Sequence, residues 1–198
     1  MWNSMKRKRS ARNRRARRCL FLILLALLAL LLIWPRTVHL EGLVSPYAIL
    51  VDADSGEAVA EKEADTNIYP ASMTKVMTAL LALEVNPNLE QPVTLPEDIF
   101  PELRAEGASM AGFRPGETAT VRDLLYGALL PSGAECCEAL AREVSGSEEA
   151  FVELMNQKAA ELGMRSTHFC NPTGLHDPEH VSTVRDMARL LRAAMQNE

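Results

Sequence analysis

The segment from Ser72 to Glu84 constrains the fold of this chain more than any other feature. It is predicted to be helical, with Pro70 just before it, and its apolar residues surround much of the helix instead of forming one stripe. These residues are Met73, Val76, Met77, Ala79, Leu80, Leu81 and Leu83. A helix that is apolar nearly all round is buried in the middle of a domain, so other elements must enclose it.

A serine and a lysine stand three positions apart on this helix, which places Ser72 and Lys75 on one face. Burial and the positive end of the helix dipole both disfavour a charged ammonium, so Lys75 can serve as a general base. Serine is a weak nucleophile that needs such a base. The alternative is a chance pair, with a capping serine and a solvated lysine. The apolar helix favours catalysis, because a buried charge must be paired or functional.

Ser132 is a second candidate, within the sequence Pro131-Ser132-Gly133 that separates two predicted helices at 124–130 and 134–144. A serine between helix ends can point outward and reach a neighbouring site. The alternative is that Ser132 caps the second of these helices.

The other predicted elements are a strand pair and more helices. Residues 47–52 and 57–61 form a hairpin around a turn at 54–56, and residues 85–119 are irregular, with five prolines. Thr120 and Asp123 form a capping box, Ser147 caps a helix that ends near Gly163, and Thr183 opens the last helix. The fold class is therefore α+β or α/β, an N-terminal strand pair followed by a helix-rich body.

The first 34 residues differ in kind from the rest. Residues 1–18 carry nine basic and no acidic side chains, whereas residues 19–198 carry 12 basic and 26 acidic ones. Residues 19–34 are apolar, which predicts a membrane anchor or uncleaved signal with its basic end in the cytoplasm. Residues 35–46 are a linker, and the domain lies outside the cytoplasm; secretion after cleavage is the alternative. The apolar run argues against a nucleic-acid-binding tail.

The cysteines and histidines do not show zinc-site spacing. Cys136, Cys137 and Cys170 are expected to be buried free thiols, with a bridge from Cys170 to one of the adjacent pair as the alternative. His168, His176 and His180 are expected to be loop residues without a metal. Met73, Met77, Met155, Met164 and Met187 are expected to fill the core.

Several segments together resemble the D-alanyl-D-alanine carboxypeptidases, the low-molecular-mass penicillin-binding proteins. They occur in family order and cover roughly residues 45–197. Ser-x-x-Lys alone is a weak signal, whereas the ordered set is a strong one. The segments are Tyr69–Thr78, Phe113–Thr118, Leu129–Ala134, Asn171–Leu175 and His180–Asp186.

The resemblance implies a β-lactamase/transpeptidase-like fold and a serine peptidase mechanism without metal or cofactor. Ser72 would attack the penultimate D-alanine of a peptidoglycan stem peptide, Lys75 would accept its proton, and Ser132 would relay a proton to the leaving D-alanine. Water would hydrolyse the acyl-enzyme, and β-lactams would acylate Ser72 as substrate mimics.

The sequence departs from the family pattern at two motifs that bear on the expected activity. Ala134 replaces the asparagine of the second motif, and the third motif, Lys-Thr-Gly, is absent, since Lys158 is the only lysine after Lys75. Residues 47–198 are thus expected to be a partial catalytic domain that lacks the C-terminal part of its sheet and has low stability because of the open edge. One alternative is a catalytically impaired wall-binding or regulatory homologue. A β-lactamase is less favoured, because only Glu179 could activate its water.

Overall fold

The computed structural model describes residues 42–197, together with Leu25, Val38 and Leu40. The predicted basic segment 1–18 and nearly all of the predicted anchor 19–34 lie outside the described residues, as does part of the linker. Within the described part, no helix is both long and apolar enough to cross a membrane. The anchor and the linker stay predictions.

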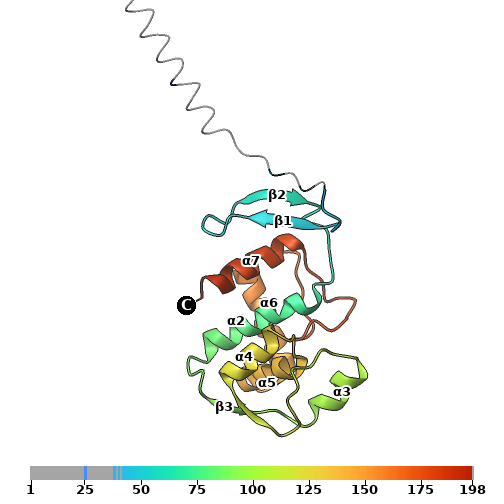
Figure 1. Cartoon of the computed structure of the whole chain (residues 1–198), viewed down its shortest axis with the longest axis vertical. Coiled ribbons are helices and arrows are strands. Elements are labelled where there is room, and N and C mark those ends of the chain that lie inside the picture. Colours follow the sequence, from blue (N-terminus) through green and yellow to red (C-terminus); the bar gives the residue numbers. More distant parts are fainter. Residues whose placement is uncertain (1–24, 26–37, 39, 41, 198) are drawn as a thin grey trace, which may run out of the picture. The chain divides into compact units, whose positions relative to one another are not determined.

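The first secondary-structure elements within residues 42–197 form a hairpin, as predicted. Strand β1 (Ala48–Val51) pairs antiparallel with β2 (Ala58–Lys62), with Ala48 opposite Lys62. The Asp52 carboxylate closes the turn by accepting hydrogen bonds from the backbone N–H and the hydroxyl of Ser55. The hairpin packs on α7 (Val184–Met195), the last helix (Figure 1).

The central helix begins differently from the prediction. Ser72 lies in a short 3-10 turn, η1 (Ala71–Thr74), and the α-helix α2 (Lys75–Val85) follows it. Such turns are frequent at helix starts, and Ala71 enters this one in the left-handed region, at φ +48°. The predicted burial is confirmed, since α2 packs against α4, α5, α6 and α7 in the middle of the fold (Figure 1).

The prediction that residues 85–119 are irregular is wrong in part. They contain strand β3 (Pro92–Thr94) and helix α3 (Ile99–Ala105), and β3 pairs antiparallel with β4 (Thr118–Thr120). Three-residue strands are too short to show an alternating pattern. Pro101 lies in the first turn of α3, where a missing N–H breaks no helical hydrogen bond.

The remaining helices are α4 (Val121–Leu129), α5 (Ala134–Ser145) and α6 (Glu148–Glu161), close to their predicted bounds. The capping box of Thr120 and Asp123 is confirmed, and so are the caps at Ser147 and Thr183. These caps satisfy N–H groups that would otherwise lack partners at helix starts.

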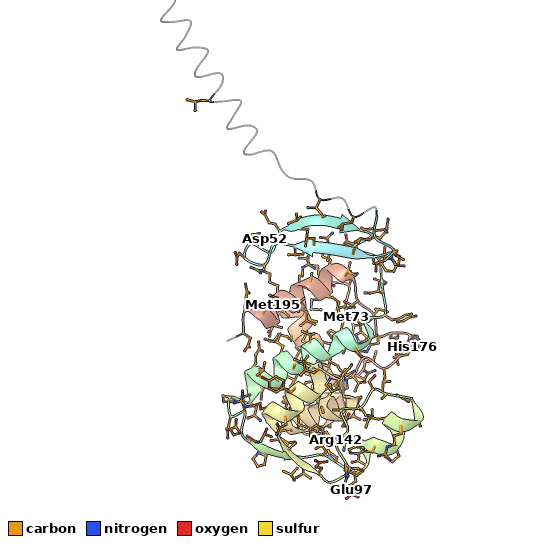
Figure 2. All side chains as sticks on the ribbon, in the orientation of Figure 1. Asp52, Met73, Glu97, Arg142, His176 and Met195 are labelled. Carbon is orange, nitrogen blue, oxygen red and sulfur yellow. The ribbon has the colours of Figure 1, made fainter. Side chains whose placement is uncertain are left out.

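The core consists of two apolar clusters, to both of which α2 contributes. One joins α2 to α3, α4 and α5, and the other joins it to α6 and α7. Four of the methionines expected in the core are buried there: Met77, Met155, Met164 and Met187. Met73 is 44% exposed, contrary to expectation, and borders an apolar groove between α2 and α7 (Figure 2).

Candidate active site

The predicted reactive pair is in contact. The Lys75 Nζ lies 3.1 Å from the Ser72 Oγ, to which it donates a hydrogen bond. Ser72 is exposed, whereas Lys75 is only 4% exposed. The serine is thus open to a substrate while its lysine partner is shielded from water.

Lys75 is buried without a salt bridge among the described residues. Its second hydrogen bond, of 2.6 Å, goes to the backbone carbonyl of Thr173. Burial lowers the pKa of Lys75 from its ordinary value, and a negative charge on Cys137 or Glu135 would oppose this shift. Burial also raises the pKa of the Cys137 thiol to about 12, so Cys137 carries no charge at neutral pH. Burial therefore shifts Lys75 toward the neutral amine that a general base requires.

The carbonyl that contacts Lys75 belongs to a tight turn, residues 171–175. The Asn171 Oδ1 accepts hydrogen bonds from the backbone N–H groups of Thr173 and Gly174. Gly174 has φ +79° and touches Ala71, so a Cβ at this position would lie 1.9 Å from the Ala71 carbonyl oxygen. Only glycine allows the turn to approach the serine so closely.

The structure excludes the capping alternative for Ser132. The N-cap of α5 is Gly133, and no side chain caps this helix. Ser132 has φ +65°, and its buried Oγ has no hydrogen-bond partner among the described residues. A left-handed residue other than glycine costs about 1–2 kcal/mol, and such strain is concentrated at functional sites.

Ser132 is not hydrogen bonded to Ser72 or Lys75 within the described part of the chain. Glu135 and Cys137, in the first turn of the helix that follows it, are near enough to shift the pKa of Lys75. The turn that carries Ser132 directly precedes this end of α5. Ala134 is buried in the apolar cluster beside it. The roles of Ser72, Lys75 and Ser132 remain predictions from the sequence. The geometry described here is compatible with them.

Among the described cysteines, the predicted free thiols at Cys136 and Cys137 are confirmed, and both are buried. Cys170 is also a free thiol but only half-buried, so the alternative of a bridge from it is wrong. Its Sγ lies 3.5 Å from the Asp177 carboxylate.

His180 is a loop residue, as expected, but it is 1% exposed and hydrogen bonded, which the sequence did not indicate. Residues 42–197 contain no cluster of three histidine, cysteine or carboxylate side chains that could hold a metal.

Glu138, on α5, is a buried carboxyl group whose effect on the stability of the fold can be measured. It is 6% exposed, its Oε2 has no hydrogen-bond partner in the described structure, and burial raises its pKa to about 8. The unfolded carboxyl loses its proton near pH 4.5, so the folded state binds more protons between pH 4.5 and 8, and stability falls as the pH rises through this window. We expect Glu138→Gln to remove this loss, a relative gain on the order of 3 kcal/mol by pH 8.

Urea unfolding at several pH values measures the effect. The exposed Glu153 provides a matched control, because Glu153→Gln should show no comparable trend. A difference between Glu138→Gln and the parent chain that stays constant from pH 5 to pH 8 would contradict the expectation.

Comparison with known proteins shows which family the chain matches. The family model of the D-alanyl-D-alanine carboxypeptidases matches residues 36–198. The chain is 40% identical over 157 residues to the D-alanyl-D-alanine carboxypeptidase DacC of Escherichia coli, covering 75% of this chain and 39% of that protein. It is 37% identical over 151 residues to DacF of Bacillus subtilis, covering 76% and 39% of the two chains.

Solved structures agree with the sequence comparison. The Streptomyces K15 DD-transpeptidase matches with a TM-score of 0.76 and 32% identity, over 81% of this chain and 64% of that one. Penicillin-binding protein 6B of Escherichia coli matches with a TM-score of 0.75 and 29% identity, over 83% and 54%.

The chain belongs to the D-alanyl-D-alanine carboxypeptidase family, and its fold is that of the DD-peptidases, as the sequence predicted. The chain spans about two-fifths of the length of the two curated relatives described above.

Proposed function

We propose that this protein is a serine-type D-alanyl-D-alanine carboxypeptidase that acts on peptidoglycan stem peptides. The observation that carries the proposal is the hydrogen bond from the buried amine of Lys75 to the exposed hydroxyl of Ser72, in a chain that belongs to this family. Family membership supplies the reaction class, and the burial of Lys75 supports its role as the base.

The proposed reaction proceeds in two steps. The Ser72 Oγ attacks the carbonyl carbon of the penultimate D-alanine as its proton passes to the neutral Lys75 amine. The C–N bond then breaks, and the leaving D-alanine amine takes up the proton of the Lys75 ammonium through Ser132. Water then attacks the resulting ester. The hydroxyl of the water stays on the acyl carbon of the shortened peptide, and its other proton goes to the Ser72 Oγ.

β-Lactams are proposed inhibitors, because opening of their ring by Ser72 leaves an ester on the same oxygen. The proposed location is the cell membrane, through residues 19–34, with residues 47–198 outside the cytoplasm. This part of the proposal rests on the basic and apolar composition of the first 34 residues.

The two alternatives have less support. Ala134 favours an impaired wall-binding homologue, but the curated relatives compared above are named as carboxypeptidases. A β-lactamase requires a carboxylate at Ser72, whereas Glu179 is exposed, and its backbone N–H bonds to the Asp177 carboxylate.

Release of D-alanine from a synthetic peptide ending in D-Ala-D-Ala tests the proposal. We expect turnover by the full chain, and at least a ~10³-fold loss in Ser72→Ala, because the variant lacks the nucleophile. Peptide binding without release would favour the wall-binding alternative, and fast nitrocefin hydrolysis would favour the β-lactamase. Equal D-alanine release by Ser72→Ala would exclude Ser72 as the nucleophile.

A further inference from the structure

The segment around the reactive serine is held by a distant part of the chain, residues 168–182. Ile68 and Ser182 exchange two backbone hydrogen bonds, of 2.8 and 2.9 Å. Thr78, one turn beyond Lys75 on α2, donates a 2.6 Å hydrogen bond to the Pro172 carbonyl. The position of the turn at 171–175 is therefore fixed relative to η1 and α2.

His180 lies at the centre of this contact. Its Nδ1 accepts a 3.1 Å hydrogen bond from the backbone N–H of Cys170, so the ring proton is on Nε2. The Nε2 lies 2.8 Å from the Thr74 Oγ1 and donates to it. His180 and Thr74 are 1% and 0% exposed, so water cannot replace either bond without opening the fold.

These two hydrogen bonds fix the two segments that adjoin Lys75. Thr74 is the last residue of η1 and directly precedes Lys75. Cys170 directly precedes the turn whose Thr173 carbonyl lies 2.6 Å from the Lys75 Nζ. His180 thus connects Thr74, which precedes Lys75 in the chain, to the turn whose Thr173 carbonyl accepts a hydrogen bond from the Lys75 amine.

We propose that His180 is a positioning residue, which through Thr74 and the Cys170 backbone holds the Thr173 carbonyl on Lys75 and directs the lysine amine at Ser72. The catalytic meaning of this arrangement rests on the proposed function, whereas the arrangement itself is a property of the fold. His180 does not touch Ser72 or Lys75 by any hydrogen bond in the described structure, so it acts through its neighbours.

The protonation state of His180 agrees with this role. Burial lowers the pKa of His180 to about 4, so the ring is neutral at pH 7. A doubly protonated ring would direct an N–H at the Cys170 N–H, and the bond would be lost. Asp177 and His168 are the charged or titratable groups that influence the ring.

The experiment measures the pKa of Lys75 directly, without relying on activity. The chain has five lysines, so selective ¹³C-lysine labelling of the full chain gives few NMR signals. Loss of one signal in Lys75→Met identifies Lys75. Its surroundings are Ser72, the Thr173 carbonyl, and Glu135 and Cys137 of α5, all of which the test variants leave in place.

Thr74→Val keeps the shape of the side chain but removes the hydroxyl, whereas Thr74→Ser keeps the hydroxyl. We expect Thr74→Val to loosen the turn and admit water, so that the pKa of Lys75 rises toward its ordinary value of 10.5. Thr74→Ser should leave the pKa close to its original value. His180→Gln should raise the pKa of Lys75 as Thr74→Val does. The double variant should raise it little further, because both substitutions remove the same hydrogen bond between His180 and Thr74.

Ser145→Ala is the control. It removes a half-buried hydroxyl group that hydrogen bonds to the Ala141 carbonyl at the far end of α5, so the pKa of Lys75 should not change. An unchanged Lys75 pKa in a folded Thr74→Val chain would overturn the proposal, even if the melting temperature falls. If His180→Gln does not fold, Thr74→Val against Thr74→Ser decides the matter alone. An inactive chain whose Lys75 pKa responds as expected would reject the proposed function and retain the positioning role.

Discussion

Replacing Lys75 with methionine is expected to slow acylation of Ser72 by a fluorescent penicillin by about 10²–10⁴-fold, the usual contribution of a general base. Methionine matches the length of lysine and suits a site that is 4% exposed, so the fold should survive. The hydroxyl of Ser72 would lose both its hydrogen-bond donor and its proton acceptor. Stopped-flow fluorescence or gel-based labelling over time measures the rate.

Two further variants show whether the amine acts as a base. Lys75→Arg keeps a charge that does not lose its proton, so it should be as slow as Lys75→Met. Lys62→Met is the control, because Lys62 donates its hydrogen bond to the Leu43 carbonyl, away from the reactive pair. In the parent chain the acylation rate should rise with pH as Lys75 loses its proton, with an apparent pKa below 10.5. Normal acylation by Lys75→Arg would exclude the lysine as the base.

The second large effect is expected at Gly174, where alanine should destabilise the fold by roughly 3 kcal/mol or more. The added Cβ would lie 1.9 Å from the Ala71 carbonyl oxygen, on a residue with φ +79°. Either the turn or η1 must move, and both bear groups that contact Lys75. Acylation of Ser72 should therefore fall along with stability.

Gly163→Ala separates steric overlap from backbone strain. Gly163 follows α6 at φ +71°, and a Cβ there meets nothing within 4 Å. Its replacement should cost only about 1 kcal/mol, the strain of the left-handed conformation. Urea unfolding of the two variants gives the comparison. Equal losses of stability would show that the close contact between Gly174 and Ala71 is not formed.

Local sequence signals predicted the parts of this fold that local chemistry determines. Thr120 with Asp123, and Thr183, mark helix starts because their side chains bond to backbone N–H groups within three residues. The burial of α2 followed from its apolar circumference. The pairing of Ser72 with Lys75 followed from helical spacing, and it holds although Ser72 lies in a 3-10 turn.

Contacts between distant residues could not be predicted in this way. Thr74 and His180 are 106 positions apart, and nothing near either residue indicates the other. A capping role was open for Ser132 because it precedes a helix, but the N-cap of α5 is Gly133, which packs closely on Ala111 and Gly127. Strands β3 and β4 depend on each other, since three residues have no strand pattern of their own.

The most direct test of the proposed chemistry is the mass of the full chain after incubation with benzylpenicillin, followed by peptide mapping. We predict a single adduct with the mass of the intact antibiotic, located on Ser72, and no adduct in Ser72→Ala. The adduct should form much more slowly in Lys75→Met. A folded chain that gains no adduct, or gains it at a residue other than Ser72, would contradict the assignment of Ser72 and Lys75 as the reactive pair.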